Sequence, residues 1–191
     1  MKRILRALLA TMAVLVLTTA MGLWSPVSAE AHSSCAVRWG SLPHAGSSNF
    51  SMTTAPILDV RAGRHACFDR LVVDVAGSVS GAYDVRYEPS VRIDGSGDLL
   101  PLRGGAFLAV VVRAPASDFE TGAVTYQPRN QDELVDVSGF RTFRQLAFRG
   151  SFEGSTTLGL GVRARLPFRV FVLPGTTAGS QRLVVDVAHR W

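Results

Sequence analysis

The side chains best suited to chemistry in this chain are arginines and aspartates, and several of them fall in a repeated hexapeptide. The segment Arg70-Leu-Val-Val-Asp-Val75 recurs letter for letter at residues 182–187. In a β-strand, alternate residues face opposite sides, so each copy places its Arg and Asp on one side and three apolar residues on the other. If the two copies are neighbouring strands, arginine and aspartate can pair across the sheet. One interpretation is a structural charge ladder on a solvated face, and the alternative is part of a polar ligand-binding surface.

A second group of arginines lies in the stretch 152–173. Arg163 and Arg165 alternate with apolar neighbours, and Arg169 follows Pro167. Proline cannot donate to a central ladder, so we expect Pro167 at a sheet edge or a bulge. The planar guanidinium fork binds carboxylates and amide oxygens, which makes this edge a candidate reader of anions or polar sugars. The alternative is that these charges protect the edge from aggregation. The candidate ligand-binding residues are therefore Arg163, Arg165 and Arg169, followed by Arg70 and Arg182.

Recognisable catalytic constellations are missing from the sequence. It contains neither a Gly-x-Ser-x-Gly elbow nor a His-Glu-x-x-His motif. The four histidines are isolated, and we expect each to be structural or solvated: His32, His44, His65 and His189. Acidic pairs such as Asp132 with Glu133 keep a hydrolase open as a weaker alternative. The prediction is a protein with no catalytic residues, no cofactor and no metal site.

One glycine-rich segment imitates a cofactor motif. Gly159-Leu-Gly-Val-Arg-Ala164 matches the dinucleotide fingerprint in its letters. That fingerprint needs a following helix whose N-terminus holds the pyrophosphate, and Pro167 would interrupt such a helix. We therefore expect these glycines to let a strand twist, bulge or approach another group closely.

The charge balance argues against a nucleic-acid partner. The chain has 20 basic and 15 acidic side chains, but Lys2, Arg3 and Arg6 lie in the first six residues. Without them, 17 arginines face 15 acids, and no lysine remains. A nucleic-acid binder would concentrate more basic charge on one surface. The hydrophobic content of 47% indicates an ordered chain, and its length favours one domain.

The N-terminus has the pattern of a secretory signal peptide over residues 1–29. A basic start precedes an apolar run from 7 to 24, and Val27-Ser-Ala29 supplies the small residues that a signal peptidase reads. We expect cleavage before Glu30, with a second candidate site after Ala31. An uncleaved anchor is the alternative, but a run of this length is marginal for spanning a bilayer. The prediction is a secreted, cell-wall-associated protein with no membrane span after cleavage.

Two cysteines, Cys35 and Cys67, fall after this signal. In an oxidising compartment an even count favours one disulfide. Such a bond would tie the weakly patterned segment 30–55 to the strand that begins at Phe68. A metal site that combines cysteine with His65 lacks a second ligand pair at useful spacing.

The remainder of the chain, 56–191, has the pattern of an all-β domain. Short apolar runs are broken by glycine and proline every 8–12 residues, which favours a two-sheet β-sandwich with a pseudo-repeat. At most a short helix is expected, between Pro115 and Asp136. The predicted strands are 57–61, 68–76, 82–93, 105–113, 134–137, 143–152, 156–165, 168–173 and 182–189.

Several of these segments together resemble the AMIN-like domain of secreted and lipid-anchored actinobacterial proteins, over about residues 56–191. The matching pieces are Cys67-Phe-Asp-Arg-Leu-Val-Val-Asp74, Tyr83-Asp-Val-Arg-Tyr87, Arg103-Gly-Gly-Ala-Phe-Leu108, Val137-Ser-Gly-Phe-Arg-Thr-Phe143, Gly161-Val-Arg-Ala-Arg-Leu-Pro-Phe-Arg-Val-Phe171 and Arg182-Leu-Val-Val-Asp-Val-Ala-His189.

The resemblance implies a function as well as a fold. AMIN domains are non-catalytic β-sandwich modules that target cell-wall amidases and envelope machinery to peptidoglycan. The first hypothesis is therefore a secreted module that binds peptidoglycan or another cell-wall component. The second is an extracellular protein-interaction module that uses an exposed sheet edge to bind an envelope protein. This chain carries no amidase domain and no lipid-attachment cysteine, so the resemblance implies a stand-alone module.

Overall fold

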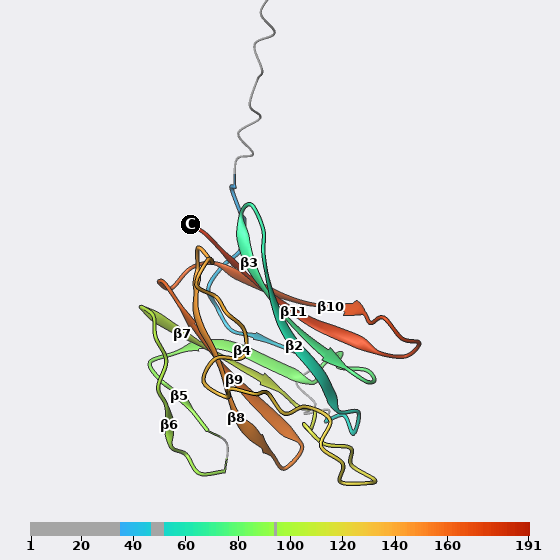
Figure 1. Ribbon diagram of the computed structural model, residues 1–191. Coiled ribbons are helices and arrows are strands. Elements are labelled where there is room, and N and C mark those ends of the chain that lie inside the picture. The colour runs from blue at the N-terminus through green and yellow to red at the C-terminus, as the bar shows by residue number, and fades with distance from the viewer. Residues whose placement is uncertain (1–34, 47–51, 94) are drawn as a thin grey trace, which may run out of the picture. The chain divides into compact units, whose positions relative to one another are not determined.

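The computed structural model describes residues 35–46, 52–93 and 95–191, which form a compact unit from Cys35 to Trp191. The expected signal peptide, residues 1–29, lies outside the described residues. Strands dominate the described chain, and they form two main antiparallel sheets and a small hairpin (Figure 1). The predicted all-β class is confirmed.

The larger sheet has five strands in the order β1-β4-β7-β9-β8. Its strands are β1 (His44–Ala45), β4 (Tyr83–Glu88), β7 (Ala106–Val112), β8 (Phe143–Phe152) and β9 (Ser155–Val162). The smaller sheet has four strands in the order β10-β11-β3-β2. These are β2 (Ile57–Arg64), β3 (Phe68–Val75), β10 (Phe168–Pro174) and β11 (Gln181–Ala188). A separate hairpin pairs β5 (Val91–Arg92) with β6 (Leu99–Leu100).

The two sheets share one hydrophobic core. Alternation sends Leu71, Val73 and Val75 of β3 to the same side, and the corresponding residues of β11 follow the same pattern. These side chains are fully buried in one cluster with residues of β7 and β9 such as Leu108 and Leu160. The repeated hexapeptide therefore supplies the centre of the four-stranded sheet's inner face, as its periodicity predicts.

The segment from Cys35 to Gly46 runs from one sheet to the other. Its first residue forms a disulfide with Cys67, directly before β3, which confirms the predicted bond. The backbone carbonyl of Gly40 accepts a hydrogen bond of 2.8 Å from the backbone N–H of Phe168, at the start of β10. The short strand β1 then pairs with β4, at the edge of the five-stranded sheet. The segment thus links the edges of both layers.

The short helix expected between Pro115 and Asp136 is absent from the structure. The described residues contain no helix, so they contain none that is long and apolar enough to span a membrane. The carboxylate of Asp118 accepts hydrogen bonds from the N–H groups of Glu120 and Thr121, which forms a tight turn. Gly122 then takes a left-handed conformation with φ of 71°, and the chain reverses. This local hydrogen bonding competes with helix formation, so the turn replaces the helix.

Two predicted strands also differ from the structure. The stretch 82–93 divides into β4 and β5, because Pro89 has no N–H group to continue the ladder. The stretch 134–137 is irregular, and it makes only isolated backbone contacts along β8. One joins the N–H of Leu134 to the carbonyl of Leu146 at 2.8 Å. Asp136 draws the backbone into a turn by accepting from the N–H of Ser138 at 2.9 Å, which ends any extended run.

The disulfide generates a stability prediction. It closes a loop of 32 residues, so the chain-entropy model gives a loss of about 3–4 kcal/mol in the free energy of unfolding when it is removed. The double variant Cys35→Ser/Cys67→Ser should therefore unfold at a much lower urea concentration than the oxidised protein. Reduced wild type is the control and should match the variant. An unchanged midpoint after reduction would contradict this account.

Candidate ligand-binding face

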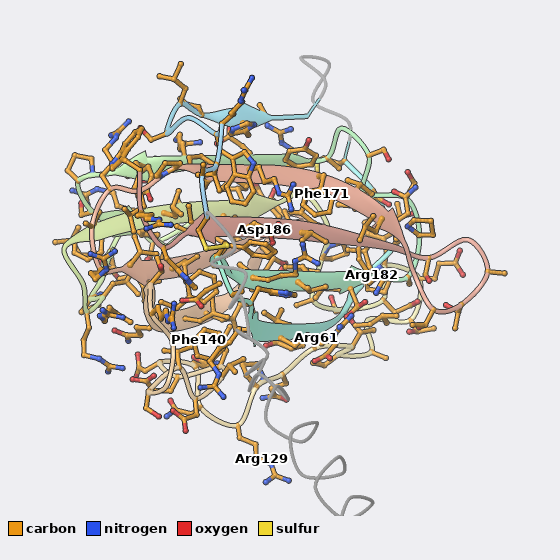
Figure 2. The ribbon with its side chains drawn as sticks, turned by 90° about the horizontal axis from the view of Figure 1, so that it is seen from above. Arg61, Arg129, Phe140, Phe171, Arg182 and Asp186 are labelled. Carbon is orange, nitrogen blue, oxygen red and sulfur yellow. A yellow bond between two sulfur atoms is a disulfide. The ribbon has the colours of Figure 1, made fainter. Side chains whose placement is uncertain are left out.

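The outward side of the four-stranded sheet, which we call the outer face, collects most of the arginines singled out from the sequence. In its first row, Arg169 of β10, Asp186 of β11 and Arg70 of β3 lie opposite one another. In the second row, Phe171, Val184 and Val72 do so, next to Arg61 of β2. The third row runs Leu173, Arg182, Asp74 and Asp59. Figure 2 shows Phe171, Asp186, Arg182 and Arg61 spread across this sheet.

The two copies of the repeat are antiparallel neighbours, and their register brings opposite charges together. Arg70 of the first copy lies opposite Asp186 of the second, and Arg182 lies opposite Asp74. Each arginine therefore faces the aspartate of the other copy. Only the first of these cross-strand pairs forms an ion pair, so the expected pairing is confirmed for Arg70 with Asp186.

Asp186 is the centre of the first row. Its side chain is 0% exposed, and Arg70 donates two hydrogen bonds to it, Nε to Oδ1 at 2.6 Å and Nη2 to Oδ2 at 2.9 Å. Arg169 donates from Nε to Oδ2 at 2.8 Å. The hydrogen bonds that Arg70 donates to Asp186 raise the pKa of Arg70 above its usual value. A carboxylate that is removed from water is stable only with such partners, so this row is fixed by the requirement to satisfy one buried charge.

Aromatic rings surround the same two guanidinium groups. The Cζ atom of Arg169 lies 4.3 Å from the ring centroid of Trp39 and 5.0 Å from that of Phe171. The Cζ atom of Arg70 lies 5.1 Å from the ring of Phe68. Cations over aromatic faces are favoured by the ring quadrupole. The result is a surface in which arginines and aromatic rings lie next to one another.

The opposite end of the outer face breaks the symmetry of the repeat. Arg61 on β2 donates Nε to Oδ2 of Asp74 at 2.9 Å and Nη2 to Oδ1 at 2.8 Å, so it takes the carboxylate that faces Arg182. Arg182 instead donates Nε to the backbone carbonyl of Pro174 at 2.9 Å. Within the described part of the chain, Arg182 has no carboxylate partner. It is a cation of this face that is left available to an outside ligand.

A hollow of about 310 Å³ lies at this end of the face. Its walls come from β2, the end of β3 and the turn between β10 and β11. They combine charged groups with the side chains of two threonines and a serine; the lining residues are Leu58, Asp59, Arg61, Asp74, Val75, Thr176, Thr177 and Ser180. This lining can exchange hydrogen bonds with hydroxyl and amide groups.

Two predicted site residues lie away from the outer face. The stretch 163–167 leaves β9 in one sheet and enters β10 in the other, so the expected strand 156–165 ends at Val162, and Arg163 and Arg165 are not on a strand. The side chain of Arg163 donates to the backbone carbonyl of His189. That of Arg165 donates to the carbonyl of Ser41 at 2.9 Å. Of the three arginines grouped by sequence, only Arg169 lies on an edge strand, β10.

Sequence reasoning predicted the aspartates of the outer face but missed its aromatic rings and Arg61. Phe171 has the same parity on β10 as Arg169, which was a usable signal once the strand was assigned. Trp39 and Arg61 belong to segments remote in sequence, and no local pattern joins them to the repeat.

The histidines do not gather into a site. His189 Nε2 lies 3.1 Å from Oδ1 of the buried Asp69. The other carboxylate oxygen of Asp69 accepts from the N–H groups of Thr142 and Phe143. This arrangement anchors the start of β8 to the four-stranded sheet. In the ranges that the structure describes, no three His, Cys, Asp or Glu residues are placed to hold a metal ion.

The chain matches a known protein family. A family model described as the AMIN-like domain matches residues 55–189. The match includes β2 to β11, and therefore all four strands of the outer face. A search of curated proteins finds no match.

The two equivalent aspartates of the repeat permit an internal comparison. Asp186→Asn leaves two guanidinium groups without a carboxylate around a buried position, and we expect a loss of about 3 kcal/mol in the free energy of unfolding. Asp74→Asn alters the same position of the other copy, where the carboxylate is 17% exposed and Arg61 is 43% exposed. There the loss should be about 1 kcal/mol or less. Urea denaturation of both variants tests the ranking, and equal losses would contradict it.

Proposed function

This chain belongs to the AMIN-like domain family, a cell-envelope-related family, and we propose that it is a non-catalytic module that binds peptidoglycan or another cell-wall component. Two further observations support an extracellular place of action. The Cys35–Cys67 disulfide fits an oxidising compartment. The first 29 residues have the pattern of a secretory signal.

The outer face is the surface that we assign to the wall ligand. The observation that carries this assignment is Arg182, whose cross-strand aspartate is bound by Arg61. A guanidinium in that position can donate to carboxylate or amide oxygens, which the stem peptide offers in abundance. Phe171, in the row next to Arg182, offers ring surface against which the apolar side of a sugar can stack. The threonine-lined hollow beside Arg182 supplies further polar contacts.

A binding role also agrees with how the acidic groups are used. The two carboxylates of the repeat serve as ion-pair partners of arginines on the outer face. Glu133, one of the acids that had suggested a hydrolase, is paired with Arg103. Asp118 is engaged in its own turn. Carboxylates with such partners hold structure, and we therefore propose a function in which the protein recognises its ligand without altering it.

A protein partner is the second candidate, and one feature of β10 favours it. The N–H of Phe168 points away from β11, toward Gly40. Because backbone groups alternate along an antiparallel strand, the N–H and carbonyl groups of Val170 and Val172 face the same way. In the described chain they have no backbone partner on that side. An extended segment of an envelope protein could add to this edge.

Co-sedimentation of the protein, starting at Glu30, with purified insoluble peptidoglycan tests the first candidate. We expect binding by the wild type and roughly tenfold weaker binding by Arg182→Ala, which loses one charge-assisted contact. Added salt should weaken the wild type more than the variant. The matched control is Arg92→Ala, because Arg92 on β5 also donates to a backbone carbonyl, that of Gly97.

The other outcomes are equally informative. If Arg163→Ala/Arg165→Ala loses retention while Arg182→Ala keeps it, the binding surface is the crossing between β9 and β10. If the wild type does not sediment with the glycan, peptidoglycan binding is wrong, and capture of envelope proteins through the β10 edge is the next experiment.

A further inference from the structure

A second and larger hollow, of about 710 Å³, lies beside the start of β8 and shares no lining residue with the outer face. Its walls come from the loop before β8, from the first two residues of β8 and from Arg103, which precedes β7. The lining residues are Arg103, Glu133, Asp136, Val137, Ser138, Phe140, Phe143 and Arg144. Phe140, which is labelled in Figure 2, stacks on Phe143 with ring centroids 5.7 Å apart and planes at 7°. The volume lies in the range of small-ligand sites.

Arg144 places a fixed positive charge in this hollow. Its Nη1 donates to the carbonyl of Phe143 at 2.9 Å and to that of Phe140 at 3.4 Å, and its Nη2 donates to that of Arg141 at 3.3 Å. Backbone carbonyls hold the guanidinium in position without cancelling its charge. Across residues 35–46, 52–93 and 95–191, Arg144 forms no ion pair.

Asp136 places a fixed negative charge in the same hollow. Its Oδ1 accepts from the N–H of Ser138 at 2.9 Å. Hydrogen bonds from Ser138 lower the pKa of Asp136, so the carboxylate stays charged near neutral pH. No arginine or histidine whose side chain the structure describes pairs with it, and it is not within ion-pair distance of Arg144.

The other two charges of the hollow neutralise each other. Arg103 forms an ion pair with Glu133, and its Nη2 donates to the carbonyl of Arg144 at 3.0 Å. Among the lining residues, Arg144 remains as a cation and Asp136 as an anion without an ion-pair partner in the described ranges, and the aromatic ring of Phe140 lines the same hollow. A ligand that satisfies both carries an anionic and a cationic group, and a carboxylate and an ammonium group are suited to these two side chains.

We propose that this hollow binds an amino-acid zwitterion, with Arg144 receiving the carboxylate and Asp136 receiving the ammonium group. In this proposal the ring of Phe140 contacts the carbon chain that joins the zwitterionic end to the rest of the ligand. The source of this ligand rests on the proposed wall-binding function. In a stem peptide that contains a diamino dicarboxylic acid, the side chain of that residue ends in an ammonium group and a carboxylate on the same carbon. The hollow would then bind this end group of the peptide, while the outer face contacts other carboxylate and amide groups of the stem peptide and the sugars.

Isothermal titration calorimetry with free diaminopimelic acid tests the site without the polymer. We expect saturable binding by the wild type and roughly tenfold weaker binding by Asp136→Asn, which removes the charge but keeps a side-chain oxygen for the turn. The matched control is Asp118→Asn, because Asp118 occupies a similar exposed turn and lies outside the hollow. Fully N-acetylated diaminopimelic acid should not bind, since its ammonium groups are gone.

A second variant guards against a folding artefact. Arg144→Lys keeps a cation but cannot reach several carbonyls at once, so it should weaken binding while its urea midpoint reports whether the loop still folds. No saturable heat from the wild type at about 10 mM ligand, where even a millimolar site would fill, overturns the zwitterion site. Equal binding by Asp136→Asn and the wild type overturns it as well.

These outcomes are separate from those of the peptidoglycan experiment. Binding of the free amino acid without retention on the polymer would support the hollow and reject wall binding. Retention on the polymer without binding of the amino acid would support wall binding and reject the zwitterion site in the hollow.

Discussion

The antiparallel pairing of the two Arg-Leu-Val-Val-Asp-Val segments brings side chains 116 positions apart into contact, and it organises the four-stranded sheet around one buried carboxylate. Asp186 cannot remain charged and dry without donors, and β3 and β10 supply them from either side. That requirement fixes the register of three strands at once. The same register sends six apolar side chains of the repeat into the core, so electrostatics outside and hydrophobic burial inside specify one alignment.

The symmetry of the repeat is broken by its neighbours. Both copies have the same sequence, but Asp186 forms ion pairs with arginines on both flanking strands, whereas Asp74 forms its ion pair with Arg61. One end of the outer face is therefore internally satisfied and rigid, and the other retains Arg182 beside a polar hollow. Identical sequences thus acquire different surroundings, because the partners of a side chain depend on which other charged groups lie near it.

The second hollow also contains charges without an ion-pair partner among the described residues. Arg103, the other arginine of this hollow, is paired with Glu133. The unusual groups are Arg144 and Asp136, which hydrogen-bond to backbone groups and not to each other. A side chain that is fixed by uncharged groups keeps its full charge for a ligand at little entropic cost. Both candidate sites of this protein are therefore recognised by a charge that the fold positions but does not neutralise.

The sequence by itself determined the all-β class, the inward and outward faces of the repeated strands, and the Cys35–Cys67 bond. These follow from local periodicity and from a simple count of cysteines. The positions of most strands followed too, although residues 115–136 form turns because side-chain hydrogen bonds at Asp118 outcompete a helix.

Only the tertiary structure decided which charges remain unpaired. Arg163, Arg165 and Arg169 are close in sequence, but the chain changes sheets between the second and the third, and Arg61 reaches Asp74 from a strand that no local pattern connects to Arg182. Ion pairing depends on distances across strands, and those distances are set when the sheets assemble around their common core.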